Sequence, residues 1–365
     1  MLFIGLISGT SIDAVDAALV DFEEENIHLV STSSTAIPDR LRQELHLLAQ
    51  NPDLPAHRFW KADVQLGELF AAAVHALIDG AGVKARAISA IGSHGQTVWH
   101  APSDPHPFTV QIGDANIIAE RTGITTIGDF RRRDIAAGGE GAPLAPAFHR
   151  AAFFDASVER GILNIGGIAN LSVVGAKSLP LGFDTGPGNT LLDAFARERF
   201  DRAMDRDAEL ARSGDIIVPL LEALLNDAYF ERRPPKSSGR EYFNSAWLLH
   251  RIGDQEALRG QDILCTLCEL TVQSAAQAIE RFAPQIEELY LCGGGAQNPL
   301  ILERLAKRLP RLRIETTEGL GIHPEWVEAV AFAWLAMRTL TGKSGNAPEM
   351  TGAKGERILG GIYRA

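Results

Sequence analysis

The alternation of apolar and polar stretches along the chain predicts an α/β protein whose short strands lead into glycine-rich turns. Residues 3–7 form an apolar run of strand length, residues 8–16 form a polar turn, and residues 17–20 are apolar again. The same pattern recurs at 161–174 around Gly166-Gly167. In α/β proteins such turns gather at one edge of the sheet, where ligands bind. Further strands are predicted at 27–32, 88–92, 108–112 and 289–292, the last leading into Gly293-Gly294-Gly295.

Helical spacing of apolar residues separates these strands. The clearest example is 59–81, where Leu66, Phe70, Ala73 and Leu77 fall on one stripe. A stripe of this kind is typical of a helix that covers one face of a sheet. The predicted helices are 40–50, 59–81, 116–122, 264–282, 299–308 and 325–340.

Residues 131–146 interrupt this alternation and mark a candidate domain boundary. The stretch is rich in glycine and conformationally permissive, which suits either a hinge or a substrate loop. With 365 residues the chain is long enough for two domains. We therefore expect one lobe over 1–135, joined by 341–365, and a second lobe over 136–340.

Composition narrows the classes of function. The chain is 45% hydrophobic with a net charge of −11, which permits a large core and argues against nucleic-acid or acidic-membrane surfaces. The N-terminal apolar run is too short to span a bilayer, and no charged region with a cleavage site precedes it. Three cysteines cannot form a disulfide framework, and Cys265 and Cys268 fall in a predicted helix, where core packing is the favoured interpretation. We expect a cytoplasmic protein.

The turn at 8–16 suits the close approach of a phosphate chain and its metal. It offers small residues, hydroxyls, backbone N–H groups and two carboxylates. The common nucleotide fingerprints are absent. Gly342-Lys343-Ser344 lacks the earlier glycine of a Walker A loop, and Gly186-x-Gly188 lacks the third glycine of a dinucleotide turn.

Asp184 is the strongest candidate for a catalytic group. It stands at the end of a short apolar strand, and a turn and a helix beginning near Asn189 follow it. Asn189 is expected to cap that helix, whose N-terminus favours negative charge. A carboxylate in this position suits a general base for phosphoryl transfer. The alternative is that Asp184 supports the turn, as aspartate often does.

Three further features suit a sugar but have ordinary alternatives. The segment 93–97 ends a strand with four polar side chains, among them His94 and Gln96, which could bind hydroxyls or local backbone. Arg131 opens a basic triplet that could clamp an anion or remain solvated. Glu328, inside the predicted helix 325–340, lies either on its wet face or toward a cleft.

Six polar and glycine-rich blocks, spread over the whole chain, form its most specific pattern. They are Ser8-Gly9-Thr10-Ser11-x-Asp13, Gly92-Ser93-His94-Gly95-Gln96-Thr97, Asp129-Phe130-Arg131, Asn164-Ile165-Gly166-Gly167-x-Ala169-Asn170, Phe183-Asp184-Thr185-Gly186-Pro187-Gly188-Asn189 and Cys292-Gly293-Gly294-Gly295-x-x-Asn298. In this order they closely resemble the motifs of the anhydro-N-acetylmuramic acid kinase family. Each block alone is a weak signal.

The resemblance implies a two-lobed, actin-like ATPase (ribonuclease H-like) fold that holds ATP and Mg²⁺ in a central cleft. It further implies that 1,6-anhydro-N-acetylmuramate, ATP and water give N-acetylmuramate 6-phosphate and ADP during cell-wall recycling. The partner is then a small anhydro amino sugar, with no nucleic acid or membrane, and a homodimer is left open. An ordinary sugar kinase and an actin-like or chaperone-like ATPase are the alternatives.

The resemblance also assigns site residues. The family's catalytic aspartate falls on Asp184, which would activate the attacking water. Asp13 and Asp16 are candidates for Mg²⁺, through water, and the sugar contacts are His94, Gln96, Thr97, Arg131 and Glu328. The ATP-binding residues are Gly9, Thr10, Ser11, Ile12, Asp13, Ala14, Val15 and Asp16, then Gly166, Gly167, Gly186, Gly188 and Asn189, then Gly293, Gly294 and Gly295.

One position departs from the family pattern. Ala14 stands where the family usually has glycine. If that position requires φ > 0, alanine carries an energetic cost there. We expect activity to be kept, with an altered nucleotide affinity.

Overall fold

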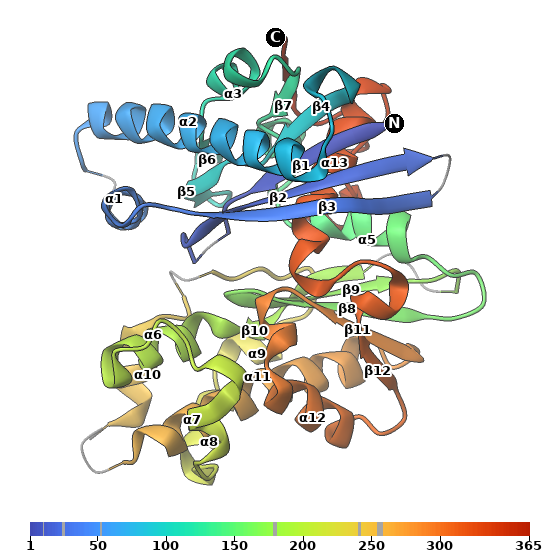
Figure 1. The fold of residues 1–365 in the computed structure, drawn as a ribbon. Helices are drawn as coiled ribbons and strands as arrows, with labels where there is room; N and C mark the ends of the chain where they lie inside the picture. Colours follow the sequence, from blue (N-terminus) through green and yellow to red (C-terminus); the bar gives the residue numbers. More distant parts are fainter. Residues whose placement is uncertain (10, 24–25, 52, 178–180, 240–241, 254–257) are drawn as a thin grey trace. The chain divides into compact units, whose positions relative to one another are not determined.

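The computed structural model describes residues 1–365 except 10, 24–25, 52, 178–180, 240–241 and 254–257. The chain forms two compact units (Figure 1). Unit 1 comprises residues 1–152 and 326–365, and unit 2 comprises 153–325. Both units combine a mixed sheet with packed helices, as the sequence pattern predicts.

The sheet of unit 1 has the order β13-β7-β4-β1-β2-β3. Strand β1 pairs antiparallel with β2 and parallel with β4, and β3 and β7 extend these pairings on either side. A separate hairpin, β5–β6, follows β4. The strands are β1 (Leu2–Ile7), β2 (Ala14–Glu23), β3 (Asn26–Ala36), β4 (Ile88–Ser93), β5 (Gln96–Ala101), β6 (Phe108–Ile112), β7 (Thr126–Gly128) and β13 (Gly361–Tyr363).

Two long helices cover opposite faces of this sheet (Figure 1). Helix α2 (Ala56–Ala81) packs on β2 and β3, and its Leu66 and Phe70 share a core with Ile4 of β1. Helix α13 (Val327–Leu340) packs on the other face, so close that a Cβ at Gly5 would lie 1.8 Å from the Ala329 carbonyl oxygen. The other helices of unit 1 are α1 (Asp39–Gln50), α3 (Ala115–Thr122), α4 (Arg132–Ala136), α5 (Ala145–Phe153) and α14 (Pro348–Thr351).

By length and composition alone, helix α2 could also cross a membrane, but the core helices of other proteins pass the same test. Of its most apolar stretch, 44% is buried inside the protein. Its packing on β2 and β3 is what the amphipathic pattern predicts for a core helix.

The sheet of unit 2 has the order β10-β9-β8-β11-β12. Its pairings follow those of unit 1: β8 is antiparallel to β9 and parallel to β11, and β9–β10 and β11–β12 complete the sheet. The elements are β8 (Arg160–Ile165), β9 (Ile168–Val174), β10 (Leu181–Pro187), α6 (Asn189–Phe200), α7 (Glu209–Arg212), α8 (Val218–Leu225), α9 (Ala228–Glu231), α10 (Ser245–Ile252), α11 (Gly260–Phe282), β11 (Glu288–Cys292), α12 (Pro299–Arg308) and β12 (Arg313–Thr316).

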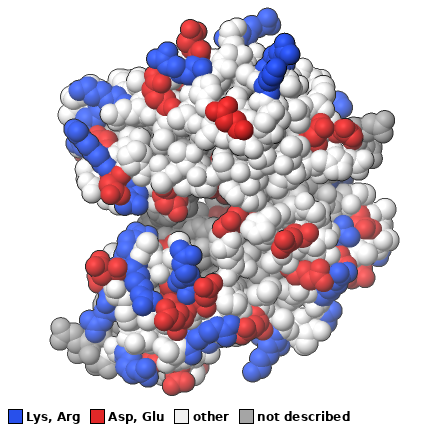
Figure 2. Space-filling model, in the orientation of Figure 1, with Lys and Arg blue, Asp and Glu red and all other residues white. Residues whose placement is uncertain are grey.

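Each unit therefore contains three antiparallel strands followed by two parallel ones, and β13 adds a sixth strand in unit 1. This order is typical of the ribonuclease H-like fold that the resemblance predicts. Cys265 and Cys268 are buried in α11, as their helical setting predicts. On the face shown in Figure 2, basic and acidic side chains are interspersed over the surface.

The division into units differs from the predicted lobe boundaries at 135/136 and 340/341. The compact units divide at 152/153 and 325/326 instead. The glycine-rich stretch 131–146 thus lies inside unit 1. Buried Asp134 holds part of it, accepting hydrogen bonds from the Gly141 amide at 2.9 Å, Asn346 Nδ2 at 2.8 Å and Thr351 Oγ1 at 2.9 Å.

Candidate active site

The turn between β1 and β2 presents backbone amides and one exposed carboxylate. Asp13 Oδ1 accepts a hydrogen bond from the Ala14 amide at 3.0 Å and another from the Ser11 hydroxyl. The Asp13 carbonyl accepts the Ile37 amide at 2.8 Å, which ties the turn to the end of β3. Thr10 lies outside the described residues. Phosphate binding by this turn stays a prediction.

The left-handed position in this turn is Ile12, not Ala14. Ile12 has φ 56°, whereas Ala14 opens β2 and is absent from the described residues with positive φ. The expected cost of alanine at position 14 is therefore not found. A buried, β-branched residue in the left-handed region is strained, and the backbone strain in this turn lies at Ile12.

The two candidate metal ligands differ in their surroundings. Asp13 is exposed, and Asp16 is half-buried in β2, where Ser34 Oγ donates to its Oδ1 at 2.8 Å. No cluster of three or more His, Cys, Asp or Glu side chains suited to a metal occurs among the described residues. Mg²⁺ bound to a nucleotide usually keeps several waters and takes one or two carboxylates, so these residues fit that kind of site.

In unit 1 the predicted sugar contacts gather after β4. His94 is 7% exposed and its ring packs on Phe332, with 4.6 Å between the ring centroids. Arg131 Nε donates to His94 Nε2 at 3.0 Å, and Arg131 Nη1 donates to the Gly141 carbonyl at 3.0 Å. His94 Nδ1 lies 2.9 Å from the Gly95 carbonyl, so the neutral tautomer that donates from Nδ1 satisfies both contacts.

The charges of this cluster are set by burial. Burial, and then the charge of Arg131, holds the pKa of His94 well below its usual value, so the imidazole is neutral at pH 7. Burial lowers the pKa of Arg131 to about 10, and the carboxylate of Glu328 partly offsets this. Glu328 is half-buried in the first turn of α13, with its charge close enough to act on Arg131.

Neighbouring side chains add further polar contacts. Ser8 Oγ donates to Gln96 Oε1 at 2.6 Å, and both side chains are buried. Gln111 Nε2 donates to Thr97 Oγ1 at 3.1 Å across the β5–β6 hairpin. The basic triplet divides: Arg131 joins His94, whereas Arg132 and Arg133 are exposed. Ser8 is a member of this cluster that the sequence did not single out as a sugar contact.

In unit 2 the predicted glycine turns lie together at the end of the sheet. The amides of Gly188 and Thr190 donate to the Gly167 carbonyl at 2.9 and 3.0 Å, and the Asn189 amide donates to the Gly166 carbonyl at 2.8 Å. Asn189 is therefore the first residue of α6 rather than its cap, and backbone carbonyls satisfy these amides. The prediction that Asn189 caps the helix is wrong.

The third glycine turn packs on the end of β8. Gly293 has φ 77°, and a Cβ there would lie 2.3 Å from Asn164 Oδ1. At Gly294 the nearest atom to a Cβ would be Asn189 Nδ2 at 3.8 Å, so this turn lies beside the start of α6. Glycine is required at position 293 both by the backbone and by the close approach.

Asp184 is held at the edge of the same sheet. Its Oδ2 accepts the Ser238 amide at 2.8 Å, its carbonyl accepts the Tyr229 hydroxyl at 2.8 Å, and its own amide donates to the Lys236 carbonyl at 3.1 Å. Sequence reasoning missed Tyr229, Lys236 and Ser238. For Lys236 and Ser238 the signal was a cluster of Pro, Lys, Ser and Gly residues at 234–239.

The fold and these sites define a class of protein. Two ribonuclease H-like units with glycine turns at their strand ends are typical of the actin-like ATPase and sugar kinase superfamily. The comparison with family sequence models is more specific: the model described as anhydro-N-acetylmuramic acid kinase matches residues 1–365, the whole chain. The chain therefore belongs to the anhydro-N-acetylmuramic acid kinase family. It is an ATP-using kinase of peptidoglycan recycling.

Two solved structures illustrate the likeness, and both are distant. Component A of (R)-2-hydroxyglutaryl-CoA dehydratase from Acidaminococcus fermentans is 12% identical, with a TM-score of 0.48, over 91% of this chain and 96% of that one. A ROK family glucokinase from Streptomyces griseus, in complex with glucose and AMPPNP, is 16% identical, with a TM-score of 0.42, over 93% and 100%. Likenesses this weak carry no argument about function.

Proposed function

We propose that the enzyme opens the anhydro ring of 1,6-anhydro-N-acetylmuramate with water and phosphorylates the oxygen on carbon 6. Water attacks carbon 1, and the bond from carbon 1 to the bridging oxygen breaks. That oxygen takes the γ-phosphoryl group of ATP. The products are N-acetylmuramate 6-phosphate, ADP and one proton. Because ATP is the phosphoryl donor, we place the enzyme in the cytoplasm.

The observation that carries this proposal is the fixed carboxylate of Asp184 beside the glycine turns of unit 2. A general base must be ionised and held in one orientation when water attacks. The Ser238 amide donates to one carboxylate oxygen and thereby stabilises the ionised form. We assign to Asp184 the removal of a proton from the attacking water.

The cluster around Arg131 suits the rest of the sugar. The substrate carries a lactyl carboxylate, and a guanidinium is well shaped to bind such a group. Arg131 remains protonated at neutral pH, because its lowered pKa is still about 10. Glu328 and Thr97 supply acceptors and a donor for the sugar's polar groups.

The nucleotide is assigned to the turn at 8–16 and to the glycine turns of unit 2. Asp13 and Asp16 would hold Mg²⁺ through water, and the ion would neutralise charge on the transferred phosphoryl group. The amides of the turn at 8–16 would orient the phosphates, since successive backbone N–H groups bind anions.

The test compares Asp184→Asn with the wild type in ADP release driven by 1,6-anhydro-N-acetylmuramate. Asparagine keeps an oxygen for the Ser238 amide but cannot accept the proton, so turnover should fall by about 10²- to 10⁴-fold while sugar binding is kept. Asp215→Asn, an exposed carboxylate of the same unit, is the matched control. Near-native turnover by Asp184→Asn would overturn the assignment.

A further inference from the structure

The segment 236–238 runs beside Asp184 at the edge of the sheet. Among the described residues, strand β10 is a terminal strand of its sheet, so one side of it has no strand partner there. The segment 236–238 bonds to Asp184 on this side. The Lys236 carbonyl accepts the Asp184 amide at 3.1 Å, and the Ser238 amide donates to the Asp184 carboxylate at 2.8 Å. The position of the carboxylate therefore depends on the position of this segment.

The side chain of Lys236 anchors the segment. It is 6% exposed, although lysine is rarely buried without a carboxylate partner. Its Nζ lies 4.6 Å from the centroid of the Tyr229 ring and 5.9 Å from that of Phe183, and it donates to the Tyr229 carbonyl at 3.4 Å. A cation over an aromatic face is attracted by the negative charge of the ring face. Aromatic rings and one long hydrogen bond thus hold this ammonium.

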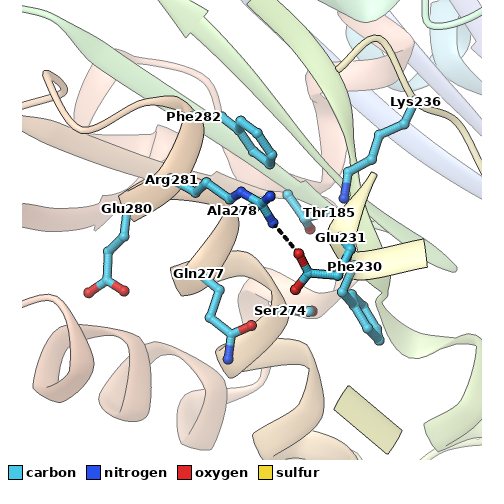
Figure 3. Close-up of a pocket in the computed structure, with 10 residues that line it drawn as sticks. All are labelled: Thr185, Phe230, Glu231, Lys236, Ser274, Gln277, Ala278, Glu280, Arg281 and Phe282. Carbon is cyan, nitrogen blue, oxygen red and sulfur yellow. Dashed lines mark hydrogen bonds and ion pairs between the residues drawn. The ribbon is translucent and has the colours of Figure 1, made fainter. Parts of the chain in front are cut away.

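The ammonium borders a cavity of about 360 Å³ in unit 2 (Figure 3). Figure 3 shows it directed toward Thr185 and Glu231, while Arg281 forms an ion pair with Glu231 at 2.9 Å. Thr185 follows Asp184 in β10, so the cavity lies against the strand that carries the proposed base. A substitution that removes the charge of Lys236 therefore acts close to that strand.

The charged groups facing Lys236 come from several elements. The pKa of Lys236 is lowered to about 8, chiefly by burial and then by the charges of Arg232 and Arg281, while Asp184 and Glu231 oppose the shift. The phenol of Tyr229 also faces it and is un-ionised at neutral pH, because burial raises the pKa of that group. At pH 7 a group with this pKa is about ten times more often charged than neutral.

We propose that Lys236 is a positioning residue for the proposed base. Its side chain fixes the 236–238 segment on Asp184, and its positive charge favours the ionised carboxylate. The inference rests on the proposed function, in which Asp184 is the base. No direct contact between Lys236 and the sugar or nucleotide is part of it.

The test compares the wild type, Lys236→Met and Lys236→Arg, with exposed Lys307→Met as the control. Methionine keeps the apolar packing and removes the charge. We expect kcat to fall about 10- to 100-fold, as for other lost positioning contacts, with the KM for sugar and ATP unchanged. The acid limb of the kcat profile should move to higher pH in Lys236→Met and stay in place in Lys236→Arg. Lys236→Gln is the second neutral variant, should the methionine variant not fold.

Amide hydrogen exchange at Asp184 and Ser238 gives a readout that needs no substrate. Faster exchange at these two amides in Lys236→Met, with no change in Lys307→Met, supports the anchoring. An unmoved acid limb, a kcat within twofold of the wild type, or unchanged exchange overturns the proposal. If the wild type does not act on the anhydro sugar, the proposed function fails, and exchange alone decides the anchoring.

Discussion

Replacing His94 with phenylalanine tests whether this buried imidazole holds Arg131 ready for the sugar carboxylate. Phenylalanine keeps a ring against Phe332 but removes the acceptor of the 3.0 Å bond from Arg131 Nε. A hydrogen bond to a charged group contributes about 1.5–3 kcal/mol. Every 1.4 kcal/mol is tenfold in affinity, so the sugar should bind about 10- to 150-fold more weakly.

The assay is a calorimetric titration of the sugar into the wild type and His94→Phe, paired with the KM for ATP. The KM for ATP should not change. His106→Phe, at an exposed site of the same unit, is the control. Because the pKa of His94 lies well below its usual value, sugar affinity of the wild type should stay level from pH 8 to 6. A loss of less than threefold in His94→Phe would refute the reasoning.

Three further outcomes follow from the geometry. Gly293→Ala should raise the KM for ATP more than tenfold, because φ is 77° there and the new Cβ would lie 2.3 Å from a neighbouring oxygen. Gly294→Ala, whose Cβ would have no atom nearer than 3.8 Å, should change the KM for ATP less than threefold. Equal effects of the two substitutions would contradict this prediction. Ala14→Gly should leave the KM for ATP within twofold and lower the stability measured by urea unfolding by about 0.5–1 kcal/mol, because position 14 lies in a strand. Burial lowers the pKa of His149 to about 3. The stability that the neutral imidazole contributes is therefore present above about pH 6.5. It is lost as the pH falls, by up to about 1.4 kcal/mol of unfolding free energy per pH unit. Urea unfolding between pH 7 and 4 should therefore show a flatter profile in His149→Gln, and parallel profiles would disprove the assignment.

Those strands and helices that the sequence pattern predicted have a strong local period. The strands over 88–92 and 108–112 and the helices over 59–81 and 299–308 are all found within a few residues of their predicted ends. The predicted lobe boundaries differ from the boundaries of the compact units. Helix α13 is apolar on nearly all sides, and such a pattern does not say which sheet it covers; the contacts at Gly5 and Gly92 that place it in unit 1 are not local.

The site residues also divide into those that the sequence pattern indicated and those that it did not. Asp184 could be singled out because a strand, a carboxylate and a turn follow one another in the sequence. Ser238, whose amide holds that carboxylate, lies 54 residues later in a loop without periodicity. The strained residue Ile12 was also not foreseen, because a β-branched side chain gives no signal for positive φ. What depends on distant pairing or on rare backbone geometry could not be derived from pattern alone.

Hydrolysis in ¹⁸O-labelled water tests the central claim most directly. If water opens the anhydro ring, the N-acetylmuramate 6-phosphate formed in the first turnovers carries one ¹⁸O on carbon 1 and none in the phosphate. The product must be trapped, for example by rapid reduction, before its anomeric oxygen exchanges with the solvent. A labelled carbon 1 is the result that the account predicts. An unlabelled carbon 1 beside a phosphorylated sugar would contradict it and would show a kinase that acts on an intact hydroxyl.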